Sequence, residues 1–303
     1  MLSILLILLS TILMPGVIAK TKAILSSRKG ASILQPWFDI FRLLKKGSIF
    51  ADGSTFIFQI APIIGLSVLI GALLMLPISN VSGALIHFKG DFLLFIYLMG
   101  LGKFFLIISA LDIGSGFEGM GANREALYGM LVEPAFFMII ATLVLLTGQS
   151  SFQSIFGHFN LDIISSVLFA ILAFYILLQF AMVEGSRLPV DDPKTHLELT
   201  MIHEVMILDN SGFDLALIEI GNKLKMALFA TIIANIVLSL VNVPIYLSII
   251  IYIIIAMGFA ITVGLAESFK ARLKLTYNSQ FILTISSISV VIFLMFLILE
   301  NNL

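Results

Sequence analysis

Ionisable side chains inside long apolar runs are the residues of this chain most able to do chemistry. Lys103, Glu133, Glu219 and Lys223 lie within such runs, with Lys225 just beyond Lys223. Each charge costs roughly 2.5–3.5 kcal/mol at the centre of a bilayer, so these side chains are expected to face a polar or wet interior. Chained carboxylates and lysines at this depth are typical of a proton path.

The spacing of the carboxylates indicates which of them act together. Glu219 and Lys223 are four residues apart with Glu first, which favours an ion pair on one helix face; a purely structural pair is the alternative. Glu133 has no partner on its own helix, so it either pairs across the bundle or holds a proton. Glu125 lies about two turns earlier on nearly the same face, and Glu184 ends another apolar run. These five residues form the candidate ion path.

The most polar stretch of the chain, Glu184 to Gly212, carries eight charged side chains and two of the four histidines. His196 and His203 are seven residues apart and lack the third ligand and the spacing of a zinc site, so we expect no metal site. The chain also lacks a Gly-rich phosphate loop and a nucleophile elbow. It therefore shows no means of catalysing a reaction alone.

The composition predicts an all-α integral membrane protein. Of the 303 residues, 60% are hydrophobic and 12% are charged, about half the charged share of a soluble domain, so the bilayer must be the solvent. The net charge of −1 gives no support to nucleic-acid binding, and the lack of cysteine excludes cysteine-ligated iron–sulfur clusters in this chain. Eight apolar runs of spanning length are expected to form one polytopic domain over 1–303. They lie near 2–19, 56–79, 92–111, 126–148, 162–183, 215–240, 243–265 and 280–299.

The basic residues are distributed asymmetrically between the two sides of the predicted spans. One side holds 13 of the 17 lysines and arginines, in the segment after the first span, the loops after the third and seventh, and the polar stretch 184–214. By the positive-inside rule this side is cytoplasmic, which places both termini outside and makes 184–214 a long cytoplasmic loop between the fifth and sixth spans. The first span lacks a basic n-region and a cleavage site, so it is expected to be retained.

Residues 35–50 separate apolar and polar side chains as a short amphipathic helix does. Trp37 lies on the apolar side, whereas Asp39 and Arg42 lie on the polar side, and Pro36 suits a first helical turn. The segment is either an interfacial anchor or one wall of a cavity that a partner or a lipid-like ligand enters. The candidate residues of such a cavity are Gln35, Trp37, Asp39 and Arg42.

Several motifs resemble those of a known family. The pattern Glu-x-x-Arg-x-Pro-x-Asp at 184–191, then Glu198, then Asp-Asn-Ser-Gly at 209–212 resembles the long cytoplasmic loop of the eight-helix membrane subunit that forms the quinone site of respiratory complex I. The longer stretch RLPVDDPKTHLELTMIHE is closer to relatives in group 4 energy-converting NiFe hydrogenases and formate-hydrogenlyase-type complexes. GANREALYGMLVEPAFF and AESFKARLKL resemble the family's fourth-helix start and last cytoplasmic loop, so the similarity covers nearly the whole chain.

The resemblance implies a non-catalytic membrane subunit of an energy-converting redox complex in the inner (cytoplasmic) membrane. Such a subunit docks hydrogenase-like large and small subunits, which carry NiFe and iron–sulfur centres, and contacts antiporter-like membrane subunits and lipid; the chain itself is expected to hold no cofactor. Glu133, Glu184 and Glu219 match the family's charged path between redox chemistry and proton or sodium translocation. The residues expected at the docking loops are Arg187, Asp191, Asp192, Glu198, His203, Glu204, Asp209, Arg272 and Lys274.

Departures from the family pattern fall around the part of the fold that would admit a quinone. Ala31 stands where the family has Pro, Gly47 where it has Glu, and Asp209-Asn210 where it has Glu-Tyr. They argue against quinone binding more than against the charged path. The alternative within the same class is the quinone-binding membrane subunit of a complex I-like NADH dehydrogenase. A free-standing ion transporter and a purely structural anchor fit less well, because no internal repeat is visible and the buried charges need a use.

Overall fold

All regular structure in the described part of the chain is helical. A computed structural model describes residues 1–51, 53–157, 163–192, 201–241 and 243–301. Eight of its helices are long and apolar enough to cross a membrane, which confirms the expected number of spans and the all-α membrane fold. They are α1 (Leu2–Leu25), α3 (Phe56–Met75), α4 (Asp91–Asp112), α5 (Gly116–Thr147), α7 (Ile163–Glu184), α9 (Gly212–Leu238), α10 (Ile245–Phe269) and α11 (Leu275–Asn301).

Three shorter helices complete the described chain: α2 (Gln35–Leu44), α6 (Phe152–Gly157) and α8 (His203–Met206). α2 is the amphipathic helix expected within 35–50, whereas the sequence does not predict α6 and α8. α5 also begins at Gly116, well before the apolar run near 126. Hydropathy detects the part of a helix inside the bilayer, but the backbone hydrogen bonds of the helix continue past that depth.

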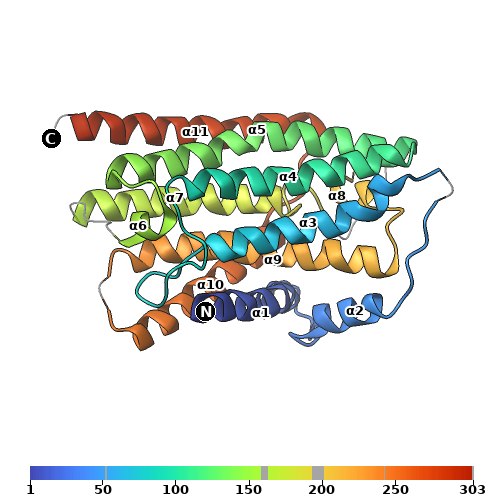
Figure 1. The fold of residues 1–303 in the computed structure, drawn as a ribbon, viewed down its shortest axis with the longest axis horizontal. Helices are drawn as coiled ribbons and strands as arrows, with labels where there is room; N and C mark the ends of the chain where they lie inside the picture. The colour runs from blue at the N-terminus through green and yellow to red at the C-terminus, as the bar shows by residue number, and fades with distance from the viewer. Residues whose placement is uncertain (52, 158–162, 193–200, 242, 302–303) are drawn as a thin grey trace.

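The long helices alternate in direction, so their connections gather at two ends of the bundle (Figure 1). Both termini lie toward one end, with the α3–α4, α5–α7 and α9–α10 links; we call this the terminal end. The opposite end holds α2, α8 and the α4–α5 and α10–α11 links, together with most of the lysines and arginines of the connecting segments. We call it the basic end. The residues expected on one side of the membrane thus lie at one end of the molecule.

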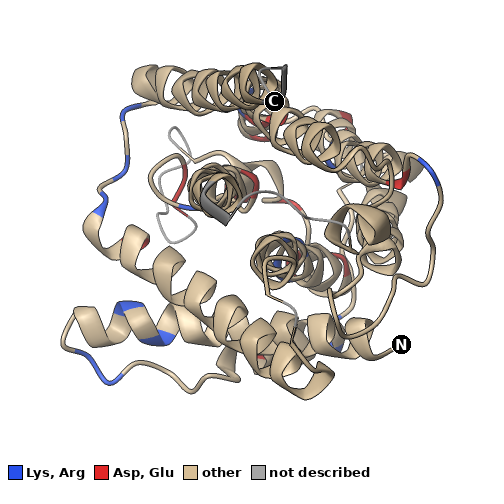
Figure 2. Cartoon of the chain, turned by 90° about the vertical axis from the view of Figure 1, so that its left-hand side faces the viewer, with Lys and Arg blue, Asp and Glu red and all other residues tan. Residues whose placement is uncertain are grey.

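α9 is the most enclosed helix of the bundle. It packs against α1, α2, α3, α7 and α10, and 72% of its spanning window is buried, the highest share among the long helices. Figure 2 looks along the bundle and shows the outer helices arranged around enclosed ones. Because lipid tails are as apolar as leucine, polar side chains in a membrane protein are best shielded on such an inner helix.

Glu267 of α10 binds two cations from separate segments of the chain. Its side chain is fully enclosed, with Lys22 Nζ of α1 at 2.5 Å and a guanidinium nitrogen of Arg187 at 3.0 Å. α1 and α10 also approach closely at this level, since a Cβ on Gly264 would lie 2.9 Å from the Thr21 side chain. The shared carboxylate therefore ties α1, α10 and the segment after α7 together at the basic end.

Glu267→Gln is expected to destabilise the protein, because it leaves Lys22 and Arg187 without their shared carboxylate. Breaking a buried ion pair costs on the order of 3 kcal/mol, and thermal unfolding in detergent should show this as a lower midpoint. Asp39→Asn is the matched control, since the Asp39–Arg42 pair is exposed and such pairs contribute little. Equal midpoints for the two variants would contradict a structural role for Glu267.

Candidate functional site

Lys103, in the second half of α4, is the centre of a buried set of charges. Its side chain is 9% exposed, and its ammonium group forms a close ion pair with Glu184 at the end of α7. The carboxylate of Glu133 on α5 lies 3.9 Å away. Gly129 makes room for the lysine, because a Cβ there would come within 2.7 Å of Lys103 Nζ. α4, α5 and α7 thus meet at one ammonium group.

Lys225 of α9 binds the same carboxylate as Lys103. Its Nζ lies 3.5 Å from the second Glu184 oxygen and 3.4 Å from the Glu184 carbonyl oxygen. The buried carboxylate of Glu184 is therefore balanced by two lysines from different helices. Such pairing is what allows a charge to be withdrawn from water, since an unpaired buried charge is very costly.

Glu125, which is also buried, completes the set. With Lys103 and Glu184 it lines a cavity of about 10 Å³, and a second cavity of about 20 Å³ lies between Lys103, Glu133, Glu184 and three phenylalanines. Each has room for about one water molecule. We call Lys103, Glu125, Glu133, Glu184 and Lys225 the buried charge cluster. It unites three of the five residues predicted for the ion path.

The other two predicted path residues lie nearer the basic end of α9. Glu219 and Lys223 form a close ion pair across one helical turn, as their spacing predicts. The Glu219 side chain is 34% exposed, whereas that of Lys223 is 11% exposed. The pair therefore lies between the connecting segments of the basic end and Lys225, two residues further along the helix.

Glu133 opens the buried charge cluster to the outer surface of this chain. Its side chain is 42% exposed, and that of Met130, one turn earlier on α5, is 72% exposed. A carboxylate at bilayer depth is costly against lipid tails. This face of α5 therefore requires a polar cover that the chain itself does not supply within its described residues.

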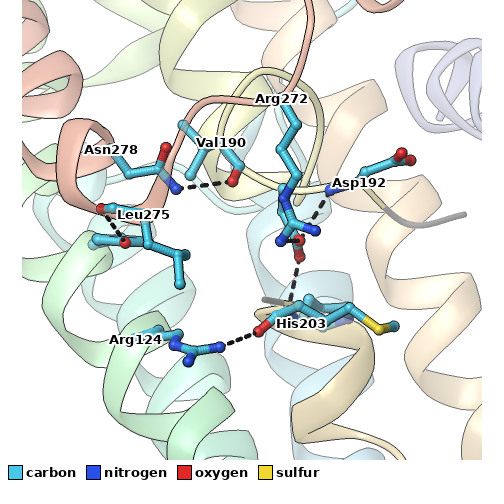
Figure 3. Close-up of polar contacts among 10 residues, drawn as sticks. Arg124, Val190, Asp192, His203, Arg272, Leu275 and Asn278 are labelled. Carbon is cyan, nitrogen blue, oxygen red and sulfur yellow. Dashed lines mark hydrogen bonds and ion pairs between the residues drawn. The ribbon is translucent and has the colours of Figure 1, made fainter. Parts of the chain in front are cut away.

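Asp191 is the centre of a second polar group, at the basic end, and Figure 3 labels its partners Arg272, His203 and Asp192. Its carboxylate accepts hydrogen bonds from Arg272 at 3.1 Å, from the His203 backbone N–H at 3.0 Å and from the Asp192 backbone N–H at 2.9 Å. Burial raises the pKa of Asp191, and the His203 hydrogen bond and Arg272 oppose that rise. The contacts join the segment after α7 to α8 and to the α10–α11 link.

His203 connects this polar group to α9. Its Nε2 lies 2.8 Å from Nδ2 of Asn222, so the ring accepts a hydrogen bond from the amide and carries its proton on Nδ1. Burial, followed by the charge of Lys225, lowers the pKa of His203 to about 4, and the ring is neutral at physiological pH. Asn222 lines a cavity of about 20 Å³ together with Lys103 and Lys225. Polar groups are therefore continuous from the basic end to the buried charge cluster.

The residues expected at the docking loops separate into enclosed and accessible groups. Asp191 and His203 are buried, at 2% and 6% exposure, so their side chains hold the loop to the bundle. Arg187 and Arg272 are occupied by Glu267 and Asp191. The partly or fully accessible members are Asp192, Glu204, Asp209 and Lys274. Glu198 lies outside the described residues.

Two accessible carboxyls at the basic end hold protons more strongly than usual. Burial, and then the carboxylates of Glu219 and Asp191, raise the pKa of Glu204 to about 7. Burial raises the pKa of Asp209, followed by Glu118, which shares a hydrogen bond with it. Glu204 therefore changes charge near neutral pH, beside the Glu219–Lys223 pair.

The four α2 residues assigned to a candidate cavity point in different directions. Gln35 donates a hydrogen bond to Asp39 at 2.9 Å, and Arg42 lies 3.7 Å from the same carboxylate, on an exposed face. The Trp37 indole N–H donates to the Ile12 carbonyl of α1 at 3.0 Å. The polar members thus pair with one another, while the indole fastens α2 to α1.

Spacing along the chain does not predict two of these ion pairs. Lys103 meets Glu184 across 81 residues, and Lys22 meets Glu267 across 245 residues. A signal for Lys103 exists, since it is a single lysine inside an apolar run, directly after Gly102. Glu267 has no comparable signal, because it stands at the polar end of its run, where an exposed carboxylate is ordinary.

His203→Gln is expected to stabilise the protein in mild acid. The folded protein keeps His203 neutral down to about pH 4, whereas the unfolded chain protonates it near 6.5, so the natural protein loses stability as the pH falls through that window. The full difference is about 3 kcal/mol. Thermal midpoints measured from neutral pH to about pH 4 should fall less for this variant. His87→Gln, at an exposed site, should behave like the natural protein, and the same behaviour from His203→Gln would contradict the buried neutral ring.

The sequence of the chain is similar to those of known proteins. A family model described as NADH dehydrogenase matches residues 1–299. Hydrogenase-4 component C of Escherichia coli (strain K12) is 30% identical over 230 residues, which cover 75% of this chain and 70% of that protein. Formate hydrogenlyase subunit 4 of the same organism is 29% identical over 213 residues, which cover 70% of this chain and 68% of that protein.

The fold also occurs in a solved archaeal complex. A chain in the structure of the membrane-bound sulfane sulfur reductase, an archaeal respiratory membrane complex, matches with a TM-score of 0.77 over 96% of this chain and 98% of that chain, at 17% identity. At that identity the likeness concerns the fold alone. The family matches confirm the resemblance that the loop and helix motifs indicate. The chain belongs to the NADH dehydrogenase family.

Proposed function

We propose that the chain is a non-catalytic membrane subunit of an energy-converting redox complex of the hydrogenase or formate-hydrogenlyase type. It docks a hydrophilic redox arm at the basic end and couples electron transfer to proton or sodium translocation. The observation that carries the proposal is the buried charge cluster, in which Lys103 joins Glu184 and Glu133 inside membrane-spanning helices. The similarity to a hydrogenase-4 component and a formate hydrogenlyase subunit supports the class of complex.

A charge change in a protein docked at the basic end reaches the buried charge cluster through the segment that follows α7. Asp191 binds Arg272 and the His203 backbone, and the His203 ring contacts Asn222 on α9. Glu204, with its pKa of about 7, gains or loses a proton readily beside these groups. In surroundings of low dielectric constant, a unit charge nearby strongly changes the proton affinity of carboxylates. The loop therefore converts a redox event into an electrostatic signal along α9.

The buried charge cluster has the composition to hold one exchangeable proton. Its two lysines and three glutamates carry a net charge of −1 when all are ionised, and one added proton makes the cluster neutral. A net buried charge is costly, so the neutral form is favoured until a signal changes the field. Glu133, the most exposed of the three carboxylates, passes the proton to whatever covers its face.

Partner subunits and lipid complete the surface of the chain. Hydrogenase-like large and small subunits with NiFe and iron–sulfur centres dock at the basic end, where Asp192, Asp209 and Lys274 are accessible. An antiporter-like membrane subunit covers Glu133, and lipid covers the remaining apolar helix faces. By the positive-inside rule the basic end faces the cytoplasm and both termini face the outer side of the cytoplasmic membrane.

The family description favours a second candidate, the quinone-binding membrane subunit of a complex I-like NADH dehydrogenase. The contacts between α1 and the segment before α2 argue against it. The backbone crosses α1 so closely that a Cβ on Gly16 would lie 1.8 Å from the Ile33 carbonyl oxygen, and Trp37 binds the Ile12 carbonyl nearby. Quinone-dependent turnover that a quinone-site inhibitor blocks would favour this candidate.

Glu133→Gln and Glu219→Gln are each expected to uncouple ion transport while assembly and substrate oxidation in detergent persist. Glutamine keeps the shape of the side chain but neither carries a negative charge nor transfers a proton, and loss of a proton-transferring group costs about 100-fold or more in rate. Ion transport per electron is measured in membrane vesicles. Met130→Gln is the matched control, because it places the same amide on the same face of α5. If both glutamate variants transport ions normally, the path is wrong.

Affinity purification of the intact complex in a gentle detergent tests the redox partners. Mass spectrometry should find hydrogenase-like large and small subunits with this chain, and metal analysis should find nickel and iron. The physical reason is that the accessible basic end and the exposed Glu133 face both require covering proteins. A preparation without nickel and without iron–sulfur protein would contradict the hydrogenase version.

A further inference from the structure

A row of residues continues along α9 from the Glu219–Lys223 pair towards the terminal end. Glu219, Lys223, Ala227, Thr231 and Asn235 occupy successive i, i+4 positions, which form one ridge that winds slowly around the helix. Thr231 and Asn235 are completely buried. Ala227, the apolar member, has the smallest side chain of the five. The ridge thus joins a charged pair at one end to neutral polar groups at the other.

Thr231 belongs to a hydroxyl network that links three helices. The Tyr252 hydroxyl of α10 lies 3.0 Å from Thr231 Oγ1 and 3.3 Å from Ser10 Oγ of α1. All three side chains are buried. A hydroxyl group both donates and accepts hydrogen bonds, so a network of this kind is able to pass a proton from one oxygen to the next.

Asn235, one turn beyond Thr231, connects the ridge to the link between α3 and α4. Its Oδ1 accepts a hydrogen bond from the Ser79 N–H at 2.9 Å, and its Nδ2 donates to the Pro77 carbonyl at 2.8 Å. A second amide, Asn80 Nδ2, donates to the Leu238 carbonyl of α9 at 3.3 Å. The two amides fasten the α3–α4 link to α9 at the terminal end of the bundle (Figure 1).

A polar cavity lies against this link. It measures about 270 Å³ and is lined by residues 77–83 with Gln153, Phe156 and Gly157, which is far more space than one water molecule needs. The buried hydroxyl of Ser79 has no hydrogen-bond partner among the described residues. Buried hydroxyls without a protein partner are normally satisfied by water. The cavity therefore has both the room and the polar lining to hold water.

Helix packing alone does not account for this arrangement. Hydrogen bonds between polar side chains stabilise membrane bundles, and this explains the network around Tyr252. It does not explain an unpartnered Ser79 hydroxyl beside a roomy polar cavity. Nor does it explain why Thr231 and Asn235 continue the ridge that carries the Glu219–Lys223 pair.

We propose that the α9 ridge and this cavity form a water-accessible half-path for protons between the terminal end and the Glu219–Lys223 pair. The inference rests on the proposed function, to which it adds a route on the side of the membrane opposite the redox arm. At each step a hydroxyl group or a water binds the incoming proton and releases its own proton to the next acceptor. The Asn235 amide has no such proton and only fastens the cavity-lining link to α9. Lys223 and Thr231 are about 12 Å apart along the helix, so the half-path requires a water beside Ala227, which is itself fully buried.

Cysteine accessibility tests the half-path, because the chain contains no cysteine. Ser79→Cys, Thr231→Cys and Ala230→Cys are prepared singly in the intact complex in oriented membrane vesicles. Silver ions, which react with thiols that water reaches, are added on the terminal-end side, and the thiol left on this chain is labelled with a maleimide after denaturation. Ala230 is the matched control, since it is as buried as the adjacent Thr231 but lies off the ridge.

Silver is expected to block the thiols of Ser79→Cys and Thr231→Cys at least about tenfold faster than the thiol of Ala230→Cys. Equal rates for Thr231→Cys and Ala230→Cys, whether fast or slow, would overturn the half-path, and so would an unreactive Ser79→Cys. The labelling requires no turnover. A labelling result that overturns the half-path would therefore leave the proposed coupling role untouched. The Glu133 and Glu219 variants test that role.

Two further variants of Thr231 test whether the hydroxyl itself is used. Thr231→Val keeps the shape but removes the hydroxyl, so proton transport per electron should fall several-fold while substrate oxidation is unchanged. Thr231→Ser keeps the hydroxyl and should restore transport. Equal transport in the two variants, at any level, would mean that the hydroxyl carries no protons and would overturn the proposal.

Discussion

The ion pair between Lys103 and Glu184 is the contact on which the rest of the structure depends. It holds two charges inside membrane-spanning helices, where neither would be stable alone. Removal of one partner from a buried pair leaves the other uncompensated, which costs more than the pair contributes. The pair therefore fixes how α4 and α7 meet, and the nearby Glu133 and Lys225 draw α5 and α9 to the same point.

α9 organises the polar interior because it is the helix best shielded from lipid. From the basic end it presents the Glu219–Lys223 pair, then Asn222 beside His203, and then Lys225 beside Glu184. The segments at the basic end fold inwards onto this helix, since Asp191 is neutralised by Arg272 and fastened to α8. A charge change in a protein docked on these segments would therefore change the electric field at the charges within the bundle.

The sequence predicts the features that depend on local physics. The thickness of the bilayer fixes the length of a span, so the apolar runs predict all eight long helices, and a four-residue spacing predicts the Glu219–Lys223 pair. The starts of α5 and α9 extend beyond the apolar runs, because a helix does not need apolar residues outside the hydrocarbon. The Lys103–Glu184 pair spans 81 residues, and no local pattern identifies such a partner.

The burial of Asp191 and His203 does not follow from the sequence. Polar residues in a charged loop suggest a solvent-facing surface, yet both side chains are buried because Arg272 and Asn222 supply partners from other parts of the chain. Burial of this kind is visible only when the helices that provide those partners are placed. Through these two residues, the loop between α7 and α9 contacts the interior of the helix bundle.

Under the proposed function, a carboxyl group of the buried charge cluster changes its protonation when the complex changes redox state. Infrared difference spectra of the intact complex, reduced minus oxidised, observe this directly through the C=O stretch of a protonated carboxyl. We expect a band that shifts in D₂O and disappears in Glu133→Gln or Glu184→Gln. A carboxyl band that persists unchanged in both variants, or the lack of any carboxyl band in the natural protein, would contradict it.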